Sequence, residues 1–260
     1  MDDDLISLRI LIASEAASER ETIRQAAMLA SIPIHVEQVA AAGDAKAACA
    51  RLARDGAFDL VFVDSRMARA ERQQALDAVR AASGRPLAIL VGPAEMKTRE
   101  VLTEGLAVDG VLAKPIVEHE LAALFETCIR ARLPKRVLIV DDAATVRSII
   151  RKILQASRFR LEAEEAAEGA AAVERARQQK FDIVFLDCQM PGLDGFDTLG
   201  GLKGAQPDAK VVMITGTRDM RIEDRARAEG ASDFLYKPFF AKDIDEVLNR
   251  LFGLMRSRWN

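Results

Sequence analysis

Short strand-like runs alternate along the chain with segments in which apolar residues recur every three or four positions. In the second half the runs lie near residues 137–140, 161–164, 183–186, 211–214 and 234–236. Such runs predict strands of a parallel sheet, and the periodic segments between them predict helices that cover both faces of that sheet. Five strand–helix units predict one doubly wound α/β domain.

The helix expected after the first of these strands has the clearest period. Its apolar residues recur at i, i+3, i+4, i+7 and i+8 as Val146, Ile149, Ile150, Ile153 and Leu154. We therefore expect one apolar stripe that faces the sheet. A final helix is expected over about residues 242–254.

The first half of the chain repeats this pattern. Segments 9–15, 58–64 and 114–115 match segments 136–142, 181–187 and 237–238 in the same order. A repeat of this length is too long for a solenoid and indicates a duplicated domain. The expected architecture is two α/β domains, residues 1–133 and 134–260, each with a five-stranded parallel sheet flanked by helices.

Composition narrows the class of protein. Hydrophobic residues make up 50% of the chain and charged residues 30%, which is typical of a folded globular protein. The longest apolar runs are far shorter than the roughly 20 residues that span a bilayer, so no membrane segment is expected. The acidic amino terminus lacks the features of a secretory signal, which favours a cytoplasmic protein.

Charge and cysteine content point to a protein partner. The net charge is −3, and neither half has the basic excess expected of a nucleic-acid binder. Cys49, Cys128 and Cys188 are odd in number and widely spaced, which favours free thiols over a disulfide framework or a zinc site.

Polar residues follow the predicted strands of the second half: Asp141, Asp142, Asp187, Thr215 and Lys237. In open α/β sheets ligands bind outside the carboxyl ends of the strands, so these side chains should converge. Two carboxylates about 4 Å apart repel each other by about 4 kcal/mol at an effective dielectric of 20. Lys237 supplies one positive charge, and a hard cation such as Mg²⁺ is expected to supply the rest.

This set of residues suits phosphoryl transfer. A carboxylate can act as the nucleophile toward a phosphoryl group when the negative charge on both reactants is neutralised. Mg²⁺ between Asp142, Asp187 and the phosphoryl oxygens would do this, with Lys237 and the Thr215 hydroxyl contacting the remaining oxygens.

Each of these residues also has a simpler structural interpretation. The Asp141-Asp142 pair could begin a helix, Asp187 could form a turn, and Lys237 could be a solvated charge. The residue types at several strand ends together favour the functional interpretation.

The motifs resemble the receiver domain of bacterial response regulators. The resemblance rests on Asp141-Asp142, on Asp187 with Met190-Pro-Gly-Leu-Asp-Gly195, on Thr215-Gly216 and on Lys237-Pro238-Phe239. It implies a flavodoxin-like (CheY-like) fold, with Asp187 as the acceptor and a histidine kinase or histidine phosphotransfer protein as the donor. It also implies that Asp142, Asp187 and the Gln189 carbonyl ligate Mg²⁺, while Asp141 acts mainly through water.

The family's switch aromatic corresponds to Phe234. The resemblance implies that Thr215 moves toward the phosphoryl group and that Phe234 turns inward. A buried strand aromatic is equally well explained by core packing, so both interpretations stay open.

The first half retains Asp64 and Lys114 but has lost the rest of the set. Ser14-Glu15 replaces the aspartate pair, Gly92 corresponds to Thr215, and Val111 corresponds to Phe234. We expect little phosphorylation of Asp64. We expect this domain to serve in docking, in homodimer formation or in regulation of the second domain. Arg66 and Arg69 could replace Mg²⁺ as the positive charge, although a solvated loop is the simpler interpretation.

The function expected first is a response regulator, not an enzyme, that signals to a downstream protein target through altered contacts. A second hypothesis is the receiver portion of a longer regulator with an output domain. A third is a metal-dependent phosphatase or small-ligand binder. The sequence has no G-x-G-x-x-G loop after the first strand of either half and no second aspartate two residues beyond Asp187. The third hypothesis therefore has little support.

Overall fold

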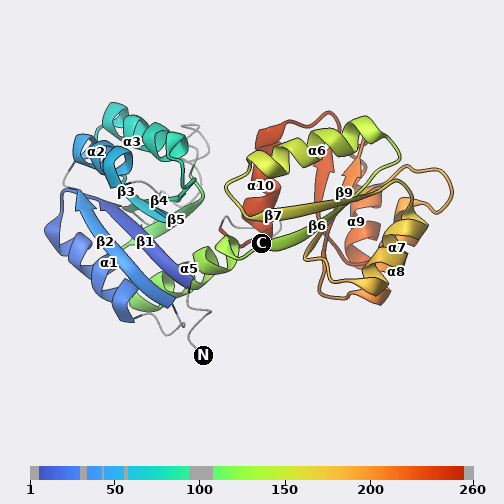
Figure 1. Cartoon of the computed structure of the whole chain (residues 1–260), viewed down its shortest axis with the longest axis horizontal. Helices are drawn as coiled ribbons and strands as arrows, with labels where there is room; N and C mark the ends of the chain where they lie inside the picture. Colours follow the sequence, from blue (N-terminus) through green and yellow to red (C-terminus); the bar gives the residue numbers. More distant parts are fainter. Residues whose placement is uncertain (1–5, 30–33, 43, 56–57, 94–107, 255–260) are drawn as a thin grey trace. The chain divides into compact units, whose positions relative to one another are not determined.

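The computed structural model describes residues 6–29, 34–42, 44–55, 58–93 and 108–254 (Figure 1). The chain forms two compact units. The first contains the described residues up to Arg132 together with residues 252–254, and the second contains Leu133–Leu251.

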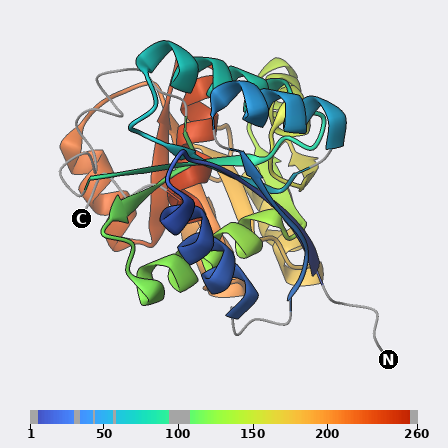
Figure 2. The same ribbon diagram turned by 90° about the vertical axis from the view of Figure 1, so that its left-hand side faces the viewer.

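The first unit contains a five-stranded parallel sheet in the order β2-β1-β3-β4-β5. Its strands are β1 (Ile6–Ala13), β2 (Ile34–Ala42), β3 (Leu60–Asp64), β4 (Leu87–Pro93) and β5 (Gly110–Lys114). Its described helices are α1 (Ala17–Leu29), α2 (Ala45–Asp55), α3 (Arg69–Ala81) and α5 (Glu118–Arg132). Figure 2 shows α2 and α3 on one face of this sheet, with α1 and α5 on the other.

The second unit has the same topology, with its sheet ordered β10-β9-β8-β6-β7. Its strands are β6 (Lys135–Val140), β7 (Leu161–Ala166), β8 (Ile183–Asp187), β9 (Lys210–Thr215) and β10 (Ala231–Tyr236). Its helices are α6 (Ala144–Ala156), α7 (Gly169–Gln178), α8 (Gly195–Ala205), α9 (Met220–Ala228) and α10 (Ala241–Leu251). All five strands predicted for the second half are confirmed.

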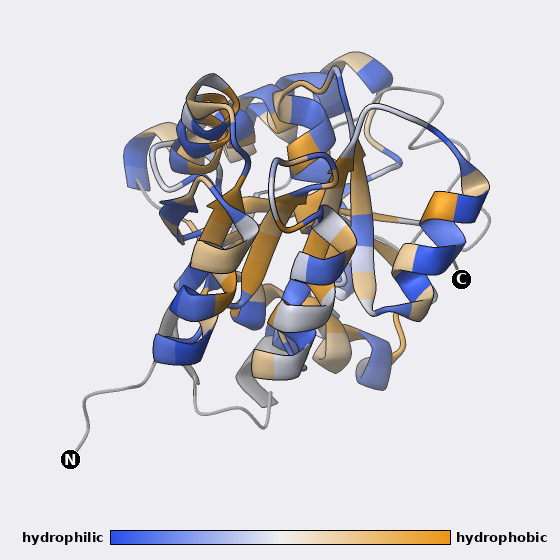
Figure 3. Ribbon diagram, turned by 90° about the vertical axis from the view of Figure 1, so that its right-hand side faces the viewer, coloured by the Kyte–Doolittle hydropathy of each residue, from blue (hydrophilic) through white to orange (hydrophobic). Residues whose placement is uncertain are grey.

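The central strands form the core of the second unit. Every residue of β8 is buried, and Figure 3 shows the apolar strands between helices whose outer faces are hydrophilic. A strand buried on both faces is expected in a parallel sheet that helices cover on each side.

The apolar stripe of α6 is narrower than its sequence predicts. Ile150 and Leu154 are buried, whereas Ile149 is 46% exposed. Successive residues of a helix point about 100° apart, so a helix lying on a sheet buries Ile150 fully and leaves its neighbour at the edge.

The last helix is shorter than expected, because α10 ends at Leu251. Gly253 follows with a φ of +73°. Glycine adopts this left-handed conformation without steric cost and commonly ends a helix in this way.

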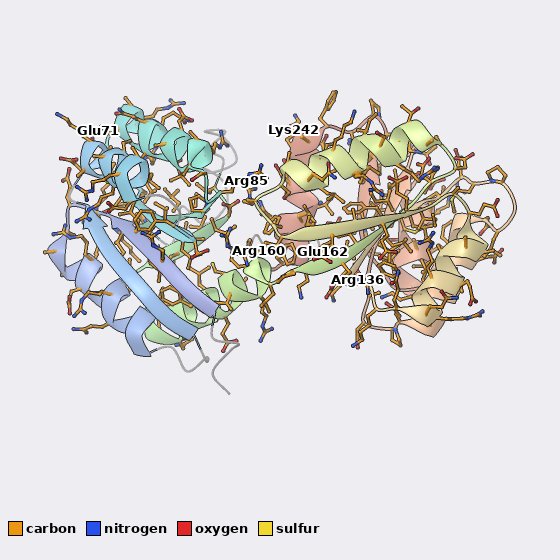
Figure 4. All side chains as sticks on the ribbon, viewed as in Figure 1. Glu71, Arg85, Arg136, Arg160, Glu162 and Lys242 are labelled. Atoms are coloured by element: carbon orange, nitrogen blue, oxygen red, sulfur yellow. The ribbon has the colours of Figure 1, made fainter. Side chains whose placement is uncertain are left out.

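Both units have the same three-residue arrangement at the amino end of the third strand. In the first unit the Arg9 amide donates to Asp59 Oδ2 at 3.0 Å, and the Arg9 guanidinium lies 5.4 Å from the centre of the Phe58 ring. The corresponding residues of the second unit are Arg136 (labelled in Figure 4), Phe181 and Asp182. Their corresponding distances are 2.9 Å and 5.5 Å. This sheet-base contact joins the first and third strands of each unit.

Candidate functional site

Three aspartates meet at the carboxyl ends of two neighbouring strands. Asp141 and Asp142 follow β6, and Asp187 ends β8, which pairs directly with β6. One carboxylate oxygen from each lies within 4.8 Å of the others. Asp141 and Asp187 are buried and Asp142 is exposed, so the cluster opens to solvent on one side.

Lys237, which follows β10, reaches this cluster. Its Nζ atom lies 3.1 Å from Asp141 Oδ2 and 3.1 Å from Asp187 Oδ2. This ammonium group contacts two of the three carboxylates, so the cluster holds more negative charge than Lys237 offsets.

Burial and mutual contacts shift the pKa values of Asp187 and Lys237. Burial raises the pKa of Asp187, the hydrogen bond from Lys237 opposes this, and the charge of Asp141 raises the pKa further. Burial disfavours the charged form of Lys237, but hydrogen bonds to Asp187 and Asp141 outweigh it and raise the pKa of the ammonium group. Lys237 is therefore protonated at neutral pH, and Asp187 is ionised less readily than an exposed aspartate.

The helix-cap interpretation of the Asp141-Asp142 pair was wrong, because Ala143 is the residue that precedes α6 and no side chain caps the helix. The backbone amide of Ala143 donates to Asp141 Oδ1 at 2.8 Å, immediately before α6 begins at Ala144. Asp141 thus holds the turn that precedes the helix with one oxygen and contacts Lys237 with the other.

Thr215 and Gln189 lie at the same end of the sheet. Thr215 ends β9, and its hydroxyl accepts from the Thr217 amide at 3.1 Å and lies 3.3 Å from Thr217 Oγ1. Gln189 is exposed, and its backbone amide donates to the Asp187 carboxylate. The structure therefore places both residues at the rim, with the Thr215 hydroxyl paired to Thr217.

Phe234 lies inside the second unit and is 4% exposed. It packs in the same cluster as Leu199 and Val211, and its ring stacks on that of Tyr236 at 6.5 Å between centroids. These contacts are those of a core residue. The switch role of Phe234 stays a prediction.

Arg147 on α6 supports the acidic loop and was not singled out from the sequence. Its Nη1 atom donates to the carbonyl oxygens of Asp141 at 2.8 Å and Asp142 at 3.2 Å. Its Nε atom donates to Glu165 on β7 at 3.0 Å. We call this arrangement the arginine clamp, because it ties the loop that carries both aspartates to a neighbouring strand.

The internal repeat contains the signal that could have revealed this clamp. Arg20 matches Arg147 in the alignment of the two halves, and it donates to the carbonyl oxygens of Ser14 and Glu15. The contact of this arginine with the two loop carbonyls is therefore present in both units, although the first has lost its aspartate pair.

The first unit lacks most of the site. Gly92 pairs with Ala113, the residue before Lys114, just as Thr215 pairs with Tyr236, so the register places Gly92 at the position of the threonine. Asp64 remains, buried and 3.0 Å from the Lys114 ammonium group.

Arg66 is exposed, as a solvated loop residue would be, yet its side chain contacts Asp64. Its guanidinium Nη2 lies 2.9 Å from Asp64 Oδ2. Arg69, the other arginine considered, begins α3 and is exposed.

Comparisons with known proteins agree with this geometry. The family described as response regulator receiver domain matches residues 137–249. The chemotaxis protein CheY of Thermotoga maritima is 36% identical over 117 residues, which cover 45% of this chain and 97% of that protein. The CheY of Bacillus subtilis is 37% identical over 115 residues, which cover 44% of this chain and 95% of that protein. The chain belongs to the response regulator family.

A solved structure extends the similarity in fold to both units. It is described as a probable two-component system response regulator/GGDEF domain protein, and it covers 95% of this chain and 98% of its own with a TM-score of 0.56. The sequence identity is 20%, so the comparison shows the fold alone. This response regulator thus has a second, receiver-like domain at its amino end, and the predicted fold class is confirmed.

The remaining sequence predictions concern thiols and membranes. Cys49, Cys128 and Cys188 are free. Burial raises the pKa of Cys188 to about 12, so the thiol beside Asp187 is protonated at neutral pH and does not compete as a nucleophile. Among the described helices, none combines the length and apolar character that crossing a bilayer requires.

Proposed function

We propose that this response regulator accepts a phosphoryl group on Asp187 from the phosphohistidine of a histidine kinase or histidine phosphotransfer protein. The observation that carries this proposal is the grouping of three carboxylates within 4.8 Å beside a single ammonium group. Asp187 is the acceptor because the matched receiver motif follows it directly and Lys237 contacts its carboxylate.

The residues at the rim fit a bound Mg²⁺ ion. Hard divalent cations prefer oxygen ligands, and the cluster offers carboxylates whose repulsion one lysine only partly offsets. Asp142, Asp187 and the backbone carbonyl of Gln189 would hold the ion, with Asp141 acting through water. When bound, Mg²⁺ supplies positive charge that lets two anionic reactants approach each other.

The residues of the chain have separate parts in the transfer. A carboxylate oxygen of Asp187 forms the new P–O bond as the P–N bond of the phosphohistidine breaks and the imidazole leaves. Lys237 offsets charge on the phosphoryl oxygens, and the Thr215 hydroxyl leaves Thr217 to donate to one of them. Phe234 then repacks, and the signal passes to a downstream protein target through altered contacts rather than through an enzymatic reaction.

The test is to incubate the whole chain with a small phosphodonor such as acetyl phosphate, with Mg²⁺ or with a chelator. We expect an acyl phosphate, recognised by its lability to hydroxylamine, to form only with Mg²⁺. Equal labelling in the presence of the chelator would contradict the proposed role of the metal, and no labelling in either condition would contradict the proposed function.

Arg147→Met should weaken the metal site without removing a ligand. The clamp holds the backbone of both aspartates, and groups that orient metal ligands typically contribute about 10–100-fold to metal affinity. We expect about a tenfold weaker affinity for Mg²⁺, measured by calorimetry. Arg151→Met is the control, because Arg151 donates to the same Glu165 at 2.6 Å from the next turn of α6. An equal loss in both variants would assign the effect to Glu165 and contradict the clamp.

A further inference from the structure

Side chains of the first unit surround the buried Asp64, and one of them, Arg66, is itself 57% exposed. Asp64 receives hydrogen bonds from the Arg66 guanidinium at 2.9 Å, Lys114 at 3.0 Å and the Ser14 hydroxyl at 3.0 Å. Glu19, on α1, lies 2.6 Å from Arg66 and 2.8 Å from Lys114. Two carboxylates and two cations therefore form one network around the position of the acceptor.

Comparison of the two units shows what changed in this pocket. The matched pairs are Ser14 with Asp141, Glu19 with Val146 and Arg66 with Gln189. A carboxylate is lost from the strand end, another is gained one turn into the helix, and a guanidinium enters two residues beyond the acceptor. The exchange moves the charge of the pocket rather than removing it.

Charge balance distinguishes the two pockets. In the second unit three carboxylates lie beside one ammonium group, which contacts two of them. In the first, Asp64 and Glu19 each contact both Arg66 and Lys114, and Glu15, at the position of Asp142, is exposed. Within the described residues, the only grouping of three acidic or metal-binding side chains is the one in the second unit. The first pocket has no comparable shortage of positive charge for a divalent cation to relieve.

The pKa of Asp64 agrees with this balance of charge. Burial disfavours ionisation of Asp64, but hydrogen bonds from the Arg66 side chain and backbone and from Lys114 outweigh it, so its pKa lies well below the ordinary value. The first carboxylate is therefore stable as an anion without any metal.

We infer that Arg66 is a built-in replacement for the divalent cation in the first domain, and that Glu19 holds its guanidinium in the pocket. The planar guanidinium contacts both oxygens of the Asp64 carboxylate, with Nη2 2.9 Å from Oδ2 and Nε 3.4 Å from Oδ1, and this forked geometry suits a carboxylate. The first domain therefore stays in one charge-balanced state whether Mg²⁺ is present or absent.

Metal binding to the full-length chain tests this inference. Substitutions in the first unit are made in a parent variant that carries Asp142→Asn and Asp187→Asn. These two changes remove two of the three acidic groups of the cluster in the second unit. Free Mn²⁺ is measured by electron paramagnetic resonance. We expect no bound Mn²⁺ in the parent. Adding Arg66→Ser should create a site in the first unit with at least about tenfold tighter binding, because Asp64 and Glu19 then share only Lys114.

Two further substitutions act as controls in the same parent. Arg66→Lys keeps a positive charge in the pocket and should bind no Mn²⁺. Arg69→Ser removes an exposed arginine of the same segment and should also bind none. Bound Mn²⁺ in the parent that disappears on adding Asp64→Asn would overturn the inference, as would a folded Arg66→Ser variant that gains no site.

A transplant keeps the inference testable if Arg66→Ser does not fold. In the otherwise unaltered chain, Val146→Glu with Gln189→Arg builds the same pair of side chains into the second unit. We expect Mg²⁺ affinity there to fall at least tenfold, roughly, as the guanidinium occupies the charge-deficient pocket. Unchanged Mg²⁺ affinity in this variant would contradict the replacement of metal by arginine.

Discussion

Asp187→Asn is expected to lower labelling by a small phosphodonor about a hundredfold or more, to background, because it removes the nucleophile itself. The amide has the size of the carboxylate and can still accept a hydrogen bond from Lys237, which lies 3.1 Å from Asp187 Oδ2. The measurement is incorporation of phosphate into the whole chain with Mg²⁺ present, together with a circular dichroism spectrum to verify folding.

The matched control for this substitution is Asp64→Asn. Asp64 ends β3 as Asp187 ends β8, and both are buried beside a lysine. Because Arg66 and Lys114 already neutralise Asp64, its loss should leave labelling within about twofold of the wild type. Label that persists in Asp187→Asn and vanishes in Asp64→Asn would reverse the assignment of the acceptor domain.

Gly195→Ala is expected to disrupt both the stability and the reaction of the second domain. A Cβ atom at this first residue of α8 would lie 2.6 Å from Cys188 Cα and 2.8 Å from the Asp187 carbonyl oxygen. These are backbone atoms next to the acceptor and cannot rotate away. We expect the free energy of opening around β8 to fall by about 3 kcal/mol, the upper part of the usual range for overpacking.

The measurement is hydrogen exchange of the β8 amides, because a protein of two domains does not unfold in a single step. Labelling should fall in the same variant, since displacing Cys188 shifts Asp187. Gly200→Ala is the control: it lies within the same helix with nothing within 4 Å of the added Cβ. It should stabilise the helix by about 0.5–1 kcal/mol. Equal exchange in both variants would show that the contact at Gly195 does not constrain the acceptor loop.

The fold and the centre of the site could be predicted from sequence because each depends on local periodicity. Strand ends are visible as apolar runs that stop at polar residues, and in a parallel sheet those ends share one edge. The convergence of Asp141, Asp187 and Lys237 follows from that rule. The duplicated domain is visible because matched segments occur in the same order.

The remaining features depend on side-chain geometry that periodicity does not contain. Long arginine side chains choose partners by distance in three dimensions, so neither the contact of Arg66 with Asp64 nor the clamp at Arg147 could be derived from spacing. The pairing of the Thr215 hydroxyl with Thr217 is set by the local path of the backbone after β9. The exposure of Ile149 depends on how α6 lies on its sheet.

The sheet-base contact of arginine, phenylalanine and aspartate has a consequence for how such a protein can evolve. It lies at the amino end of the third strand in both units, remote from the carboxyl ends where the two pockets have diverged. This contact is therefore separate from the residues of the two pockets, and substitutions in a pocket can accumulate without removing it. A duplicated gene segment of this kind can lose its ancestral reaction, remain folded and become available for a new role.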